Sequence, residues 1–297
     1  MLSKKLNLIP SRIIALFEGA YNEPYFLTFL RVSAGLIAMV DLLSMLPDFT
    51  LLFSPNATIV PQEILYLPSE YFDLQHMFYG YLFRNHFEVY FYSIAFWGYL
   101  GSLLCLTVGL FSRVAAIGAL IFQLLIYKSF PEFNYGYDQF ITMTFFYCCL
   151  FPVGKYYSID SLMWGNRNKE KKVMFNYQRV LQIHLCIVYF SSGLAKLLDF
   201  DWWNGNSMWK SLCSISNEYY KIPSIILTIA GIGVVLLEVF YTALVFFKKT
   251  RQIALVLCIL MHISIGFFLD LYPFAAIMCV WNIAAFSKFT TVPKKLA

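Results

Sequence analysis

Long apolar segments alternate with polar ones along almost the whole chain. A helix needs roughly 20 apolar residues to cross a bilayer, and the shorter segments are expected to be tilted or partly re-entrant. The pattern therefore predicts an all-α, polytopic membrane helix bundle of about eight spans. The predicted spans cover residues 25–46, 87–110, 112–130, 137–151, 175–198, 222–247, 252–270 and 272–287.

Composition supports a membrane protein and excludes two other classes. Apolar residues make up 60% of the chain and charged residues only 13%, whereas average soluble domains carry about 25% charged residues. No basic patch is interleaved with stacking aromatics on a polar scaffold, so no nucleic-acid partner is expected. The seven cysteines contain no Cys-x-x-Cys pair, and the His and carboxylate residues lack ligand spacing, so no metal is predicted.

The distribution of Lys and Arg predicts the orientation of the spans. When the amino terminus is placed in the cytoplasm, basic residues concentrate in the cytoplasmic segments and acidic ones outside. Both termini are then cytoplasmic, and residues 1–24 form a basic, amphipathic segment. The long loops 47–86 and 199–221 face outward, where they are expected to cap a membrane cavity. With no internal repeat, a single domain over 1–297 is the simplest organisation.

Lys196 lies near the outward end of the fifth predicted span. An ionisable residue in a membrane helix is a functional candidate, because lipid makes an unpaired charge costly. Gln182, Tyr189 and Ser192 fall within about 40° of Lys196 around the helix. Two interpretations remain open: the amine snorkels to the interface, or an apolar pocket destabilises its charged form and makes it a base or nucleophile.

Other polar residues interrupt the predicted spans. Arg31 and Asp41 are about 15 Å apart along the first span and about 80° apart around it, so each needs a partner on another helix. We interpret these two residues and Glu238 as structural, for example in buried ion pairs that fix helix packing. His262 lies in the seventh span, where an unsatisfied imidazole is costly. His184 points about 120° away from the Lys196 face and is predicted to be structural.

Several motifs, in their order and spacing, resemble the HTTM (horizontally transferred transmembrane) family, which includes the vitamin K-dependent γ-carboxylases. The resemblance covers nearly the whole chain. The motifs are Arg31…Gly35…Asp41, Asn134-Tyr-Gly-Tyr-Asp138, Phe151-Pro152-Val-Gly154…Ser158-Ile-Asp160, Gln182…Tyr189-Phe190-Ser-Ser-Gly193-Leu-Ala-Lys196, Asp201-Trp202…Gly205…Met208 and His262…Gly266-Phe267.

The resemblance implies a role for Lys196 and a cofactor. In the carboxylases a lysine at the matching position is the base that deprotonates reduced vitamin K. The implied cofactor is therefore a reduced quinone of the vitamin K hydroquinone type, bound among the fourth to eighth helices. The residues expected to line the site are Tyr189, Ser192, Trp202 and Trp203, with Asn134, Asp138 and His262 as second candidates.

Two departures from the carboxylases limit what the resemblance implies. The loop from Asn134 to Tyr137 has no His where the carboxylases place a catalytic one, and the chain stops at Ala297 without their large luminal part. A full protein γ-carboxylase is therefore not expected. Some bacterial members of the family act in maturation of secreted peptide toxins, as in sporulation delaying protein B, and this chain resembles that kind too.

The sequence leaves alternative functions open. The first hypothesis is a quinol-dependent enzyme of the bacterial cytoplasmic membrane whose active site faces outward and acts on a secreted peptide. The second is a non-catalytic maturation or chaperone factor that works with an accessory protein on such a peptide. A transporter is disfavoured, since no inverted repeat or matching pair of Gly/Pro-broken helices occurs.

Overall fold

The computed structural model describes most of the predicted spans. In these residues the chain forms eleven α-helices and no β-strand. Most of the segment 1–24 and of the loop 47–86 lies outside the described residues, so their predicted roles stay predictions. The described residues are 23–49, 51, 81, 88–127, 134–165, 175–216 and 221–286.

Each of the eight predicted spans coincides with a helix whose bounds are close to those expected. These helices are α3 (Glu23–Ser44), α7 (Glu88–Val108), α8 (Ser112–Tyr127), α9 (Gly136–Leu150), α11 (Tyr177–Leu198), α14 (Ser224–Phe246), α15 (Lys248–Leu269) and α16 (Tyr272–Phe286). Three short helices in the polar connections were not predicted. They are α10 (Ile159–Trp164), α12 (Phe200–Trp203) and α13 (Asn206–Cys213).

Four of the described helices are long and apolar enough to cross a membrane: α3, α11, α14 and α15. The apolar stretches of α7, α8 and α16 are shorter. Large apolar side chains on α14 and α15 are more than half exposed, as expected of a lipid-facing surface. They include Ile225, Ile229, Phe240, Ile253 and Phe267. The chain is thus an integral membrane protein, while the count of eight spans and the side of each terminus stay predictions.

The chain divides into two compact units, which are described separately. One unit comprises residues 27–168, and the other comprises residues 1–26 and 169–297. The prediction of a single domain stays a prediction.

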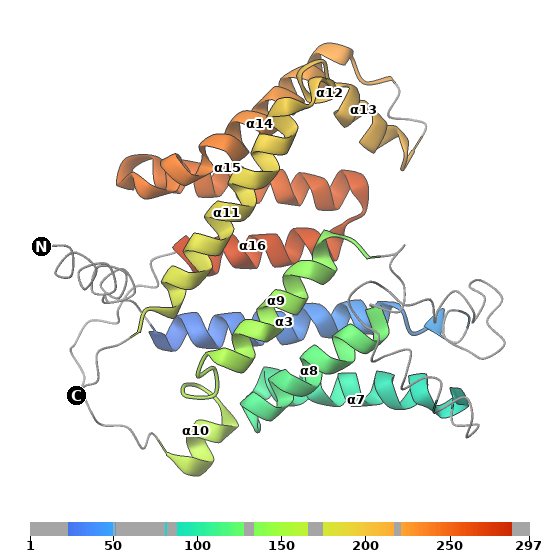
Figure 1. Cartoon of the computed structure of the whole chain (residues 1–297), viewed down its shortest axis with the longest axis vertical. Coiled ribbons are helices and arrows are strands. Elements are labelled where there is room, and N and C mark those ends of the chain that lie inside the picture. The colour runs from blue at the N-terminus through green and yellow to red at the C-terminus, as the bar shows by residue number, and fades with distance from the viewer. Residues whose placement is uncertain are drawn as a thin grey trace, which may run out of the picture. The chain divides into compact units, whose positions relative to one another are not determined.

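In the unit 27–168, α7 and α8 pack along each other and α9 packs beside α8 (Figure 1). The turn between α7 and α8 passes through Gly109, whose φ of +76° favours glycine. The carboxylate of Asp160 accepts hydrogen bonds from the Phe111 and Ser112 amides and the Ser112 hydroxyl, each at 2.7 Å. These bonds satisfy amides that the start of α8 leaves free.

Arg31 in α3 is 1% exposed and reaches main-chain carbonyls of the same unit. Its Nη1 donates to Leu106 and Thr107 oxygens at 2.9 Å, and its Nη2 donates to the Tyr157 oxygen at 2.7 Å. The first two carbonyls belong to the last turn of α7, where helix carbonyls lack intrahelical partners. The residue does find its partners on another helix, but these are carbonyls and not the carboxylate of an ion pair.

In the other unit, α11, α14, α15 and α16 pack together, and α12 and α13 lie against α14 (Figure 1). The helices α11 and α14 come unusually close at Gly193. A Cβ at this position would lie 2.6 Å from the Val239 nitrogen and 2.9 Å from the Glu238 carbonyl carbon. Only glycine permits this approach, which brings the two main chains together one turn before Lys196.

Candidate functional site

Lys196 lies in the last turn of α11 and pairs with Glu238 of α14. Its Nζ is 2.6 Å from Glu238 Oε2 and 2.5 Å from Ser192 Oγ. The Lys196 side chain is 19% exposed and that of Glu238 is 8% exposed. Glu238 therefore supplies a counter-charge to Lys196 within the bundle. This arrangement differs from an amine that snorkels to the interface and from an isolated neutral base.

Trp202 covers the ion pair from the α12 side. The Lys196 Nζ lies 5.2 Å from the centroid of the Trp202 ring, within the range of a cation–π contact. The Trp202 main chain rests on α14, since a Cβ at Gly231 would lie 2.5 Å from the Trp202 oxygen. Trp203 Nε1 donates to the Leu197 carbonyl at 3.0 Å and so caps α11.

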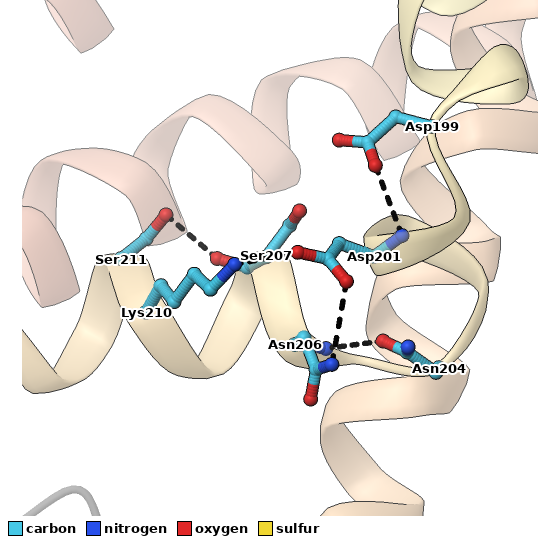
Figure 2. Close-up of polar contacts among 7 residues, drawn as sticks. All are labelled: Asp199, Asp201, Asn204, Asn206, Ser207, Lys210 and Ser211. Carbon is cyan, nitrogen blue, oxygen red and sulfur yellow. Dashed lines mark hydrogen bonds and ion pairs between the residues drawn. The ribbon is translucent and has the colours of Figure 1, made fainter.

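A polar corner between α12 and α13 holds the segment that carries Trp202 (Figure 2). Lys210 Nζ lies 2.5 Å from Asp201 Oδ2, and Asn206 Nδ2 donates to Asp201 Oδ1 at 3.3 Å. The hydrogen bond from Lys210 lowers the pKa of Asp201, and the same bond raises the pKa of Lys210. The pair is solvent-exposed, so its effect is to orient the corner rather than to stabilise it strongly.

A buried hydrogen-bond chain crosses the same unit about two turns before Lys196 in α11. Asn282 Nδ2 donates to the Tyr189 hydroxyl at 2.8 Å, and Tyr241 donates to Asn282 Oδ1 at 2.8 Å. The Tyr189 hydroxyl lies 2.7 Å from His262 Nε2. Because Tyr189 already accepts the Asn282 amide, we assign its own hydrogen to His262 Nε2. That tautomer leaves the buried Nδ1 of His262 carrying a hydrogen that has no partner among the described residues.

The ion pair and the buried chain share the α11–α14 interface. The rings of Tyr189 and Tyr241 contact each other across it, with centroids 4.1 Å apart and the ring planes tilted by 35°. Lys196, which contacts Glu238, lies seven residues after Tyr189 in α11. At the helical rise this is about 10 Å along the axis. The α11–α14 interface thus holds the Lys196–Glu238 ion pair near one end and the buried, uncharged hydrogen-bond chain through Tyr189 about two turns away.

Two predicted site residues belong to the other unit, 27–168. Asn134 lies just before α9, and Asp138 lies in its first turn. Asp138 Oδ2 accepts the Tyr135 amide at 3.0 Å, which caps the start of α9. Within this unit Asp41 accepts a hydrogen bond from the Tyr127 hydroxyl at 2.6 Å. Asp41 therefore also finds its partner on another helix.

The sequence analysis did not identify Asn282 and Tyr241 as members of this interface, and it gave Glu238 only a structural role. Asn282 and Tyr241 complete the chain to Tyr189, and Glu238 is the direct partner of Lys196. The sequence signal for Asn282 and Glu238 was a polar residue inside an apolar span, and Tyr241 had no such signal. Gln182, expected on the Lys196 face, instead donates to the Ala285 carbonyl at 2.6 Å and joins α11 to α16.

The ring of His184 packs against that of Trp281, with centroids 5.1 Å apart, and its structural role stays a prediction. Within the described residues, no group of three or more His, Cys, Asp or Glu side chains is placed to hold a metal ion.

Comparison with known proteins gives one match. A family model for the HTTM domain matches residues 55–287, a range that contains the Lys196 interface and the motifs from Asn134 to Phe267. Searches of curated proteins and of solved structures each returned no match.

Proposed function

The chain belongs to the HTTM domain family, and from that premise we propose that it is a membrane enzyme that uses Lys196 as a base on a lipid-soluble quinol. Its final substrate is a secreted peptide, modified at the outer face of a bacterial cytoplasmic membrane, with an accessory maturation protein as a further partner. The observation that carries this proposal is the close contact of the Lys196 amine with Glu238 and Ser192 beneath the Trp202 ring.

The ion pair explains how the lysine becomes a base. A base needs an unprotonated amine, whereas a lysine beside a carboxylate holds its proton. Transfer of one proton from Lys196 Nζ to Glu238 Oε2, across 2.6 Å, leaves a neutral amine and a carboxylic acid. Burial reduces the free-energy difference between the ion pair and this neutral pair, because two ions lose hydration in an apolar surrounding. The amine can then accept a new proton while Glu238 retains the first.

The residues around the pair fit a hydroquinone. The flat indole of Trp202 offers a stacking surface beside the amine. In the part of the chain that the structure describes, the buried Nδ1 of His262 has no hydrogen-bond partner. When bound, a reduced quinone supplies an acidic hydroxyl and the electrons for reaction with oxygen. Ser192 orients the amine, Glu238 holds a proton and Trp202 shields the pair from water. Tyr189 holds the His262 ring in place.

We propose proton abstraction by Lys196 and no later step of the carboxylase reaction. The carboxylases of the family place a catalytic His in the loop that here runs from Asn134 to Tyr137, and this loop contains none. We therefore do not propose carboxylation.

The test compares two lysines of the same end of the unit. Lys196→Ala removes the proposed base, and Lys210→Ala removes a 64% exposed lysine of the α12–α13 corner. Each protein is purified in detergent, its bound lipids are extracted for mass spectrometry of quinones, and quinol-dependent oxygen uptake is measured. We expect uptake in the wild type and in Lys210→Ala, and a loss of at least about 100-fold in Lys196→Ala.

Full oxygen uptake by a correctly inserted Lys196→Ala protein would refute the proposal. A Lys196→Arg variant supplies a second check, since arginine preserves the charge and the contact with Glu238 but stays protonated. It should be as inactive as the alanine variant while keeping wild-type stability.

A second candidate is a non-catalytic maturation or chaperone factor. Leu198, Phe200 and Trp209 at the α12–α13 end are 79%, 74% and 46% exposed. Such a surface suits an apolar peptide segment as well as lipid. This function requires neither quinone nor oxygen uptake, so a protein that supports peptide maturation in cells while lacking both would favour it over the enzyme.

A further inference from the structure

An aromatic and apolar surface lies in the unit 27–168, apart from the residues of the proposed function. It surrounds the six-residue helix α10, none of whose residues is buried (Figure 1). The ring centroids of Phe111 and Trp164 are 5.5 Å apart, and Tyr157 directly precedes the cap residue of α10. Five large side chains, each at least 46% exposed, form what we call the α10 surface: Phe111, Tyr157, Leu162, Met163 and Trp164.

The main chain is strained at two residues of the α10 surface. Phe111 and Tyr157 have φ values of +45° and +44°, in a region that bulky residues rarely adopt and that the surrounding structure must support. The Asp160 carboxylate accepts the Phe111 amide at 2.7 Å. The Arg31 guanidinium donates to the Tyr157 carbonyl at 2.7 Å. Charged side chains of the unit thus hold this main chain in place while the two aromatic rings are exposed.

The α10 surface is continuous with an exposed apolar stripe on α8. The stripe consists of Val114, Ile117 and Ile121, which share one side of the helix at spacings of three and four residues. Such a stripe is expected of a helix side that faces lipid, and Phe111 directly precedes the first turn of α8. Trp and Tyr gather where membrane helices end, at the level of the lipid headgroups. The α10 surface has the composition and the place that suit this level.

Basic residues flank the α10 surface. Arg113 is exposed in the first turn of α8, and Lys155 is half-buried two residues before Tyr157. The acidic residue of α10, Asp160, already accepts the amides of Phe111 and Ser112. In the sequence, the stretch 166–174 that follows α10 adds four basic residues and one acidic residue. This excess of positive charge complements an anionic lipid surface, to which each nearby Lys or Arg adds attraction.

We propose that the α10 surface binds anionic phospholipid. Its aromatic rings insert at the level of the headgroups, and Arg113 and Lys155 contact the lipid phosphates. Because hydrogen bonds within the unit already fix the main chain at Phe111 and Tyr157, presenting these rings costs little further ordering on binding. The flanking charges and the continuity with the α8 stripe favour lipid over a partner protein. The site fixes the depth of this end of the unit in the bilayer, independently of the Lys196 interface.

The first experiment measures binding of phosphatidylglycerol and phosphatidylcholine to the purified full chain by native mass spectrometry. The wild type should bind phosphatidylglycerol more tightly by about tenfold or more, since each cation near an anionic lipid contributes a factor of about five. Replacing Arg113 and Lys155 together by Gln should remove most of this preference. Lys249→Gln is the matched control, because it removes an exposed lysine of the other unit. It should leave the preference unchanged to within about twofold.

The second experiment locates Trp164 in nanodiscs that contain phosphatidylglycerol. The chain has six Trp residues, so the Trp164 emission is obtained as the difference between the wild type and Trp164→Phe. Lipids brominated near the headgroup should quench this emission more strongly than lipids brominated near the chain ends. Emission that neither lipid quenches would place Trp164 in water or against a partner protein, and either outcome would overturn the proposal.

Two results of the binding experiment would also overturn it. One is equal affinity of the wild type for the two phospholipids. The other is an equal loss of preference in Lys249→Gln, which would show attraction to positive charge in general and no site at α10. If the double variant does not fold, Arg113→Gln decides: an unchanged preference in that variant counts against the site.

Discussion

Replacing Glu238 by Gln leaves the ammonium of Lys196 largely buried without a counter-charge. The side chains have nearly the same size, so packing against Gly193 is preserved and only the charge is lost. Replacing Lys196 by Met removes the other half of the pair. The double variant removes both charges, so it should be less damaged than the sum of the two single changes predicts.

The expected magnitude follows from the exposure of the pair. Removing one partner of a fully buried ion pair costs about 3–5 kcal/mol, whereas an exposed pair contributes about 0.2–1 kcal/mol. Side-chain exposures of 19% and 8% place this pair nearer the buried case. Ser192 and Trp202 still contact the amine in Glu238→Gln and reduce the loss. We therefore expect a coupling free energy of about 2 kcal/mol.

The assay is thermal unfolding of the wild type, Lys196→Met, Glu238→Gln and the double variant in one detergent. A loss of about 2 kcal/mol corresponds to a fall in the midpoint of roughly 5 °C for a chain of this size. Glu238→Gln should show that fall, and the double variant should recover most of it. If the single effects add to within about 0.5 kcal/mol, the two side chains do not interact in the folded protein, and the mechanism proposed for Lys196 loses its basis.

Three further predictions concern the same unit. Gly193→Ala should lower stability by about 1–3 kcal/mol because its Cβ meets the α14 main chain, while Gly233→Ala, with open space around it, should leave the midpoint unchanged or higher. Tyr189→Phe removes the hydroxyl between His262 and Asn282 and should cost about 2 kcal/mol in the same unfolding assay. Because the pKa of Asp201 is lowered in the folded protein, its contribution to folding stability is present above the unfolded-state pKa. That contribution is lost as the pH falls through the folded-state pKa. Carboxyl carbon NMR should therefore show Asp201 titrating at a higher pH in Lys210→Ala, and an unchanged titration would contradict the contact.

The helices were predictable because apolar length alone identifies a membrane segment. All eight predicted segments are helical, and the end of the Lys196 helix at residue 198 was predicted at that position. The short helices α12 and α13 were not predicted, because they lie in a polar connection and depend on local contacts such as that of Asp201 with Lys210. Hydropathy has no signal for a helix of four to eight residues that is half-exposed.

The candidate site was only partly predictable for a related reason. The contact of Lys196 with Ser192 follows from helical spacing within one segment, and it is present. The contact with Glu238 requires knowing that α11 packs against α14 in a particular register, which Gly193 sets by its missing side chain. Asn282 was overlooked because an amide in an apolar span was not weighed as a partner for the phenol of Tyr189.

Arg31 has a consequence for the biosynthesis of the protein. Its carbonyl acceptors lie 75 residues further along the chain at Leu106 and 126 residues further at Tyr157. At roughly 5–20 residues per second, the ribosome delivers them about 4–25 s after the arginine. An arginine near the centre of a membrane helix costs about 2.5–3.5 kcal/mol at insertion. The helix α3 therefore enters the bilayer with its cation uncompensated, and its final depth and packing are reached only after the Tyr157 segment has left the ribosome.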